Sequence, residues 1–346
     1  MLINSIDPSG DSSPLAKGAR SLLSRYSWEI MLLIILALTN ALNFSISPYY
    51  KWGKLLDATN LFLDKGFLAM SMTLVILTGY IDISVASTVA LSSVVMAVSY
   101  NAGAGVPMPL AMIICLLTGA ACGALNGLIL VKFSELAPMI VTLATQIIYR
   151  GIALIILEDK AAGKFPSWYP NLGWGYAGAF PIMMAAFFIL FLVFAFLLHK
   201  TNYGRTVYAV GKNKLACRFS GINVDRIIFT NFTLNGLMAA VTALFLTSRM
   251  GSTRPNVANA YEMDVIAMVV LGGVSTAGGK GRMGGVLISI FIVGLLRYGL
   301  GLININTQVL MMVVGGLLVL AVAIPEMRLG SLVKGRRPTV PASAKT

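Results

Sequence analysis

Ten runs of apolar residues follow one another along the chain, and they constrain its fold more than any other feature. A helix needs about 20 predominantly apolar residues to cross the hydrocarbon core of a bilayer. Only 11% of the 346 residues are charged, whereas a soluble domain carries roughly 25%. The sequence therefore predicts an all-α polytopic membrane protein with about eight to ten transmembrane helices. The runs cover residues 28–47, 61–79, 84–100, 107–131, 138–157, 179–198, 227–247, 263–277, 283–303 and 307–324.

The number of crossings depends on one short run, at 263–277. A half-helix that enters the membrane and returns on the same side would account for its length, so eight, nine or ten crossings stay open. The first run, at 28–47, is too long for a cleaved signal peptide, and no small-residue cleavage site follows it.

The distribution of basic residues predicts the orientation, because cytoplasmic loops of membrane proteins are enriched in Lys and Arg. With the N-terminus in the cytoplasm, 17 of the 26 Lys and Arg residues fall in cytoplasmic segments and 6 in external ones. We therefore expect cytoplasmic tails at 1–27 and 328–346, a transmembrane domain at 28–327, and a large basic cytoplasmic loop at 199–226. The net charge of +13 is attributed to the gathering of basic residues in cytoplasmic loops, and no nucleic acid partner is predicted.

Motifs for nucleotides, metals or catalysis are not convincing in this sequence. Residues 279–284 match G-x-G-x-x-G, but an apolar helix precedes them where a dinucleotide site needs a strand. His199 is the only histidine, and the three cysteines lack zinc or disulfide spacing. We expect no catalytic residue, no metal and no cofactor.

Small residues predict one close helix contact. Gly119, Gly123 and Gly127 recur every four residues and form a flat face on one helix, which lets a neighbouring helix approach closely. Asn126 lies beside this face. An amide in hydrocarbon needs a partner, so Asn126 either bonds another helix or lines a polar path.

Four ionisable residues lie at membrane depth, where charges are costly: Asp82, Asp264, Arg150 and Arg297. Both aspartates lie at ends of apolar runs, so we interpret them as helix caps in preference to proton relays. Intramembrane carboxylates are too few to argue for a proton-driven carrier.

Three stretches carry a family resemblance. They are GYIDISVA at 79–86, GRTVYAVGKNKLACRFSGI at 204–222 and YEMDVIAMVVLGGVSTAGGKG at 261–281. Together they resemble the permease subunits of ABC importers for ribose-type monosaccharides, and the third stretch is the most specific. Tyr80 and Ala86 in the first stretch, and Lys212, Cys217 and Phe219 in the second, depart from the family pattern.

The resemblance implies a bundle similar to the vitamin B12 importer permeases, located in the cell inner membrane. It also implies three partners: ATP-binding subunits, a periplasmic sugar-binding protein, and a second permease copy, which is either identical or a paralogue. Relatives carry ribose, xylose, arabinose, galactose, rhamnose or autoinducer 2, so the substrate stays open. The alternative is a self-contained ion-coupled carrier or channel.

The resemblance also implies which residues act. The second stretch is similar to the loop with which such permeases contact their ATPase, and we expect a short helix at about 213–220, closed by Gly221, to dock there. A helix lying on the membrane surface is the other interpretation. We expect Tyr80, Asp82 and Asn126 to line the substrate pathway, because sugar hydroxyls need polar partners. The expected contact residues are Gly204, Arg205, Gly211, Asn213, Arg218, Ser220, Gly221 and Ile222.

Overall fold

The structure is a computed structural model. It describes residues 26–101, 105–158 and 160–306, together with a few positions between 308 and 319. The predicted tail at 328–346, nearly all of the tail at 1–27 and much of the last apolar run lie outside the described residues.

Six of the described helices are long and apolar enough to cross a membrane. They are α2 (Ser27–Ile46), α6 (Met108–Lys132), α7 (Pro138–Leu157), α9 (Ile182–Lys200), α12 (Val224–Met250) and α14 (Met283–Leu302). A seventh span would come from a pair of segments bent by 56°, Trp52–Thr59 and Leu63–Leu77. The predicted class, an all-α polytopic membrane protein, is confirmed.

The remaining elements are short. The helical ones are η1 (Trp52–Lys54), α3 (Leu55–Thr59), α4 (Leu63–Leu77), α5 (Val85–Asn101), α8 (Asn171–Trp174), α10 (Asn202–Lys212), α11 (Lys214–Phe219) and α13 (Tyr261–Leu271). Two antiparallel pairs join β1 (Ala162–Gly163) to β4 (Ser252–Thr253) and β2 (Tyr176–Ala177) to β3 (Phe180–Pro181). In place of the predicted run at 263–277 the chain forms the 11-residue helix α13 and an irregular segment. Tyr261 at the start of α13 bonds Asp64, and Gly279 after it bonds Leu77, at opposite ends of α4. The segment therefore does not return to the same side, as the predicted half-helix would.

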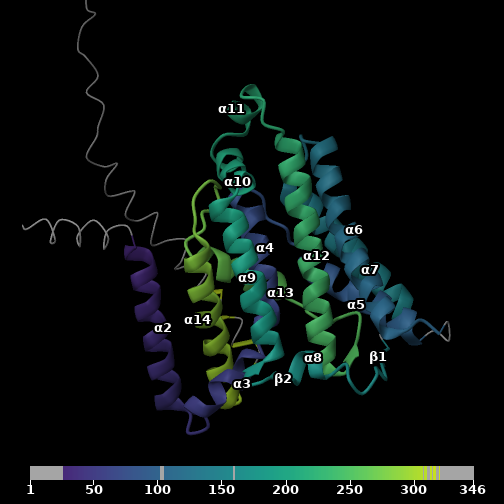
Figure 1. Ribbon diagram of the computed structural model, residues 1–346, viewed down its shortest axis with the longest axis vertical. Helices are drawn as coiled ribbons and strands as arrows, with labels where there is room; N and C mark the ends of the chain where they lie inside the picture. Colours follow the sequence, from purple (N-terminus) through teal and green to yellow (C-terminus); the bar gives the residue numbers. More distant parts are fainter. Residues whose placement is uncertain are drawn as a thin grey trace, which may run out of the picture.

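Helix α4 forms the centre of the bundle, since every one of its residues is buried. The outer helices α2, α7 and α9 instead expose large apolar side chains such as Leu38, Ile155 and Phe196. Figure 1 shows α2 at one edge of the bundle and α6 and α7 at the other. Exposed apolar faces on the outside and polar groups inside are what a lipid solvent favours.

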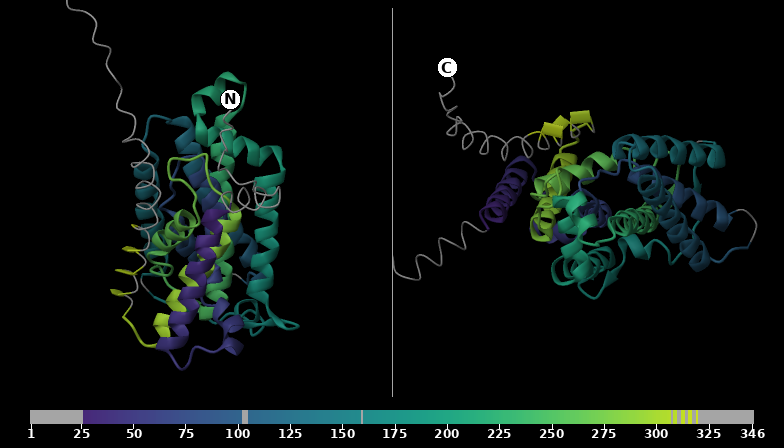
Figure 2. Two further views of the ribbon diagram at one scale, coloured as in Figure 1. Left: turned by 90° about the vertical axis from the view of Figure 1, so that its left-hand side faces the viewer. Right: turned by 90° about the horizontal axis from the view of Figure 1, so that it is seen from above.

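The two ends of the bundle differ. Helices α10 and α11 lie at one end, which we call the α11 end, and α3, α8 and the short strands lie at the opposite one, the α8 end (Figures 1 and 2). Helices α10 and α11 together replace most of the predicted loop at 199–226.

The predicted glycine face of α6 lies against α12. A β-carbon built on Gly123 would be 3.0 Å from the Cα atom of Gly236, and one built on Gly119 would be 2.6 Å from the Cβ atom of Ala240. At Gly127 the same construction falls 3.0 Å from the Cα atom of Phe229. The two backbones therefore pack at a distance that only small residues permit.

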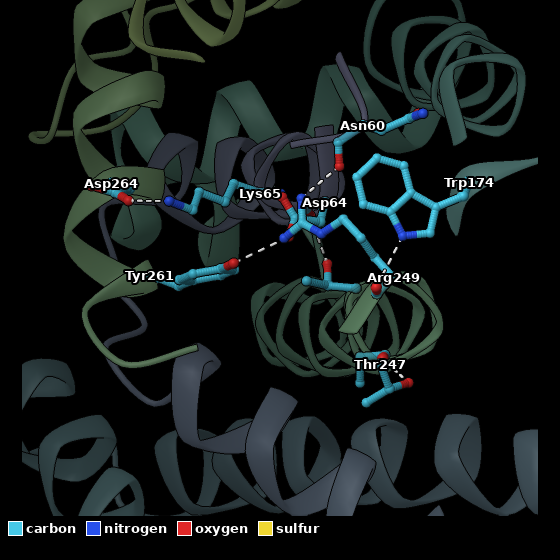
Figure 3. Close-up of polar contacts among 10 residues, drawn as sticks. Asn60, Asp64, Lys65, Trp174, Thr247, Arg249, Tyr261 and Asp264 are labelled. Atoms are coloured by element: carbon cyan, nitrogen blue, oxygen red, sulfur yellow. Dashed lines mark hydrogen bonds and ion pairs between the residues drawn. The ribbon is translucent and has the colours of Figure 1, made fainter. Parts of the chain in front are cut away.

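A buried carboxylate, Asp64, joins three helices at the α8 end (Figure 3). It accepts hydrogen bonds from Arg249 Nη2 at the end of α12 (3.0 Å) and from the Tyr261 hydroxyl at the start of α13 (3.1 Å). The Asp64 side chain is fully buried and that of Arg249 nearly so. A charge in this position is stable only when its partners are in place.

A second carboxylate, Asp264, extends this cluster to α14. Its two oxygens bind Lys65 Nζ (2.6 Å) and the guanidinium of Arg297. The first turn of α13 receives no side-chain cap, so the interpretation of Asp264 as a helix cap is wrong. The carboxylate instead neutralises two buried cations. A pattern of apolar runs does not reveal this pairing, because both cations are distant from Asp264 in the sequence.

We predict that Gly123→Leu destabilises the bundle by about 1–3 kcal/mol or more, because the added side chain overlaps the α12 backbone. The thermal midpoint and the level of the purified protein should both fall. Gly151→Leu in α7 is the matched control, since nothing lies within 4 Å of a β-carbon there. Equal midpoints for the two variants would contradict the packing shown.

We predict that Asp264→Asn lowers the free energy of unfolding by about 3–5 kcal/mol, because it leaves Lys65 and Arg297 buried without a counter-charge. Replacing Lys65 by Met in the same chain should recover part of the loss, as measured by thermal denaturation in detergent. Glu158→Gln, in an exposed pair with Lys160, should leave the midpoint unchanged. An unaltered midpoint in Asp264→Asn would show that the cluster does not hold the helices.

Candidate functional site

The chain breaks its helical path between α4 and α5, inside the bundle. Asp82 occupies the break, and its side chain is buried. Its Oδ1 atom accepts from the backbone N–H and the hydroxyl of Ser84 (3.0 and 2.7 Å), and its Oδ2 atom from Asn235 Nδ2 of α12 (2.9 Å). The bond to the Ser84 N–H lies one residue before α5 begins, so it holds the turn that leads into the helix and does not cap an N–H group of α5 itself. The bond to Asn235 adds a link between helices.

This polar network continues into three more helices. Asn126 Nδ2 of α6 donates to the Ser84 hydroxyl (2.8 Å), and the Tyr149 hydroxyl of α7 donates to Asn126 Oδ1 (3.1 Å). Ser71 of α4 donates to Asn235 Oδ1 (2.7 Å). Because buried amides and hydroxyls are costly without partners, the network fixes the break against α4, α6, α7 and α12.

The structure brings together two of the three predicted pathway residues. Asp82 and Asn126 share Ser84 as a partner, and Asn126 bonds other helices, which is one of its two predicted roles. Tyr80 lies apart, beside α11. The partners Asn235 and Ser84 were missed, although the two amides within the apolar run at 227–247, Asn231 and Asn235, are a signal that could have identified Asn235.

The three stretches that carry the family resemblance meet at the α11 end. The backbone N–H of Gly279 donates to the carbonyl of Leu77 (2.8 Å), and the Tyr208 hydroxyl donates to the carbonyl of Gly281 (2.8 Å). A β-carbon on Gly211 would fall 2.5 Å from the nitrogen of Gly279. Residues separated by as many as 200 positions thus form one backbone-to-backbone junction, and Gly211 is required because no side chain fits there.

Lys214 connects α11 to the break. Its Nζ atom lies 3.6 Å from the centre of the Tyr80 ring, a cation–π contact. Burial, followed by the charge of Arg218, lowers the pKa of the Lys214 ammonium. These residues line a groove of about 420 Å³ between α11, the break and the start of α12.

Helix α11 supplies the exposed part of this end. Asn213 caps it by accepting from the Ala216 N–H (2.9 Å), and Gly221 ends it in a left-handed conformation with φ of +77°. Leu215 and Phe219 are 63% and 85% exposed. Helix α11 is the short helix predicted at about 213–220, and it presents an apolar surface outside the bundle.

The other predicted contact residues divide between the two short helices and the turn that follows. Gly204 is buried in α10, where a side chain would overlap the end of α9. Arg205 contacts Asn202, Arg218 pairs with Asp225 (2.7 Å), and the Ser220 hydroxyl donates to the Ala216 carbonyl. Ile222 is half-buried behind α11. The exposed predicted residues other than Arg205 of α10 therefore gather around α11, and Gly204 and Gly211 anchor α10.

Two contacts therefore link the short helices to the rest of the bundle: Lys214 of α11 contacts Tyr80 in the break, and Tyr208 of α10 bonds Gly281 in the segment after α13. Within residues 26–101, 105–158 and 160–306 no three His, Cys, Asp or Glu side chains are grouped as metal ligands would be.

Comparison with known proteins gives the family. Residues 55–322 match the sequence model of the family described as the branched-chain amino acid transport system permease component. The chain is 34% identical over 306 residues to the autoinducer 2 import system permease protein LsrD of Yersinia enterocolitica, covering 86% of this chain and 91% of the relative. The LsrD proteins of Escherichia coli O9:H4 and Shigella flexneri are also 34% identical, over 86% of this chain and 92% of theirs.

No solved structure matches the chain significantly, so the likeness to the vitamin B12 importer permeases stays a prediction. The resemblance to the permease subunits of ABC importers is confirmed by both the family match and the relatives. The chain belongs to the family of transport-system permease components described for branched-chain amino acids.

Proposed function

We propose that this permease imports a small sugar-like solute, of the class that includes autoinducer 2 and the ribose-type monosaccharides, by coupling to ATP hydrolysis on another subunit. The observation that carries the proposal is the junction at the α11 end, where an exposed apolar helix is tied to the buried helix break. The names of the relatives support the solute class.

The partners follow from this assignment. The exposed Leu215 and Phe219 side chains of α11 offer a surface for an ATP-binding subunit, because an apolar side chain that is neither in lipid nor in the core favours burial against a protein. A periplasmic binding protein would deliver the solute at the α8 end. A second permease copy, identical or a paralogue, would complete the pathway.

The orientation and the lack of catalysis are part of the same proposal. The excess of Lys and Arg in alternate loops supports a cytoplasmic location for the α11 end and for both termini. The chain itself is non-enzymatic, and its role is to convert movement of the ATPase into opening of a path.

Reconstitution tests this function. Proteoliposomes containing the chain, its candidate partner permease and its ATPase should take up autoinducer 2 or ribose only when ATP and the binding protein are both supplied, since no energy source is built into the spans. An ion gradient without ATP should give no uptake. Gradient-driven uptake by the chain alone would instead identify an ion-coupled carrier.

In the same assay, Asn126→Leu should lower uptake while the amount of permease in the membrane stays unchanged, if Asn126 lines the path. Equal losses of uptake and of permease in the membrane would instead assign Asn126 a packing role.

We predict that Gly221→Val uncouples ATP hydrolysis from uptake while the permease stays in the membrane, because valine is strained at φ of +77° and α11 would be misplaced. A loss of uptake of at least tenfold is expected, with weaker co-purification of the ATPase. Gly178→Val is the matched control: its φ is +67°, its β-carbon also meets nothing within 4 Å, and it lies at the α8 end. Full uptake and full co-purification in Gly221→Val would place ATPase docking elsewhere.

A further inference from the structure

A cavity of about 650 Å³ opens at the α8 end, away from the junction described above. The residues that line it include Trp174 of α8, Arg249 at the end of α12, Tyr261 of α13 and the connecting residues Arg254, Asn256 and Asn259. Its volume is typical of a small-molecule site, because such pockets usually have a volume of about 300–1,000 Å³.

The floor of this cavity is rigid. Arg249 is held by Asp64 and by the carbonyl of Asn60 (2.5 Å), and Trp174 Nε1 donates to the Arg249 carbonyl (3.0 Å). Figure 3 shows the Arg249 side chain running between Trp174 and Tyr261. Two aromatic rings are thus fixed around a guanidinium whose charge is already balanced, which suits a ligand with both apolar and polar faces.

The loop over the cavity is held in an unusual conformation. Ala258 and Ala260 both have left-handed backbones, with φ of 57° and 64°, which are unfavourable for residues other than glycine. Arg150 Nη1 of α7 donates to the carbonyls of Pro255 and Val257 (2.5 and 2.8 Å). Backbone strain that surrounding bonds maintain is concentrated at ligand sites.

The polar groups that line the cavity indicate the chemical class of its ligand. Asn256 and Asn259 are exposed, and each amide can both donate and accept, as hydroxyl groups do. None of the described residues that line the cavity is an Asp or a Glu, so the ammonium group of an amino acid would lack a counter-charge. The aromatic rings of Trp174 and Tyr261 can pack against the apolar C–H face of a sugar ring.

We propose that this cavity is a binding site for a small neutral polyol, with Trp174 and Tyr261 against the ring and with Arg254, Asn256 and Asn259 on the hydroxyls. The permease therefore binds solute itself at the α8 end, before the path opens. The inference rests on the proposed function, since it takes the solute to be sugar-like.

Equilibrium dialysis of the full chain, with its partner permease and ATPase in nanodiscs and without binding protein, tests the site. Autoinducer 2 and D-ribose are the probes and L-leucine is the competitor. We expect saturable binding of at least one probe that leucine does not displace. Trp174→Ala and the double variant Asn256→Ala/Asn259→Ala should each weaken it at least tenfold. Trp168→Ala, which removes a tryptophan equally 47% exposed that does not line the cavity, should bind as the wild type does.

The results separate this inference from the proposed function. Absence of binding, displacement by leucine, or equal binding by Trp174→Ala and Trp168→Ala would overturn the polyol site, even where ATP-driven sugar uptake is intact. A loss of affinity for the binding protein without any change in solute binding would also overturn it and would assign the surface to protein docking. Absence of uptake by the wild-type system overturns the proposed function itself.

Discussion

The buried carboxylate of Asp82 is the interaction on which the rest of this structure depends. A helix that stops inside a membrane protein leaves backbone N–H and C=O groups without partners, and hydrocarbon supplies none. Asp82 accepts from the backbone N–H and the hydroxyl of Ser84, the residue just before α5, while Asn235, Asn126 and Tyr149 bind the pair to neighbouring helices. Because the break is fixed in this way, the segment before it can present Tyr80 to Lys214 and the carbonyl of Leu77 to Gly279. The junction at the α11 end therefore exists only because the break is stabilised.

Helix α4 connects the two ends of the molecule. Its 15 residues span about 22 Å at 1.5 Å per residue, from Asp64 in the charged cluster to Leu77 at the junction. Ser71, near its middle, bonds Asn235, which in turn bonds Asp82. Since α4 is buried along its whole length, it cannot shift without moving the groups at both ends. Helix α4 thus joins the junction at the α11 end to Asp64, which holds Arg249 at the floor of the cavity.

The sequence predicted the fold class, most spans and the stretches that matter, because apolar period, small-residue spacing and family pattern are local properties. Gly119 and Gly123 are examples: their spacing alone predicts a close helix contact, although not that α12 is the partner. Asp264 is the opposite case. Its position at the start of a run suggested a cap, whereas Lys65 and Arg297, 199 and 33 residues away, determine its role. Pairings of distant polar residues leave no periodic signal, and so the network around Asp82 and Asn235 could not be assembled from one sequence.

The proposed polyol site puts solute selection on side chains at the α8 end of the bundle. The family description names branched-chain amino acids, whereas the relatives named above are permeases for autoinducer 2, so related sequences carry descriptions with chemically different ligands. Such a difference requires few changes, because an amino acid needs a free carboxylate for its ammonium group and a polyol needs groups that donate and accept. In this chain Asp64 and Asp264 are already bound to Arg249, Lys65 and Arg297, and the buried Glu262 accepts from Gln146 Nε2. None of these three carboxylates lines the cavity, so the proposed polyol site is left with amide, hydroxyl, guanidinium and aromatic groups to select its solute.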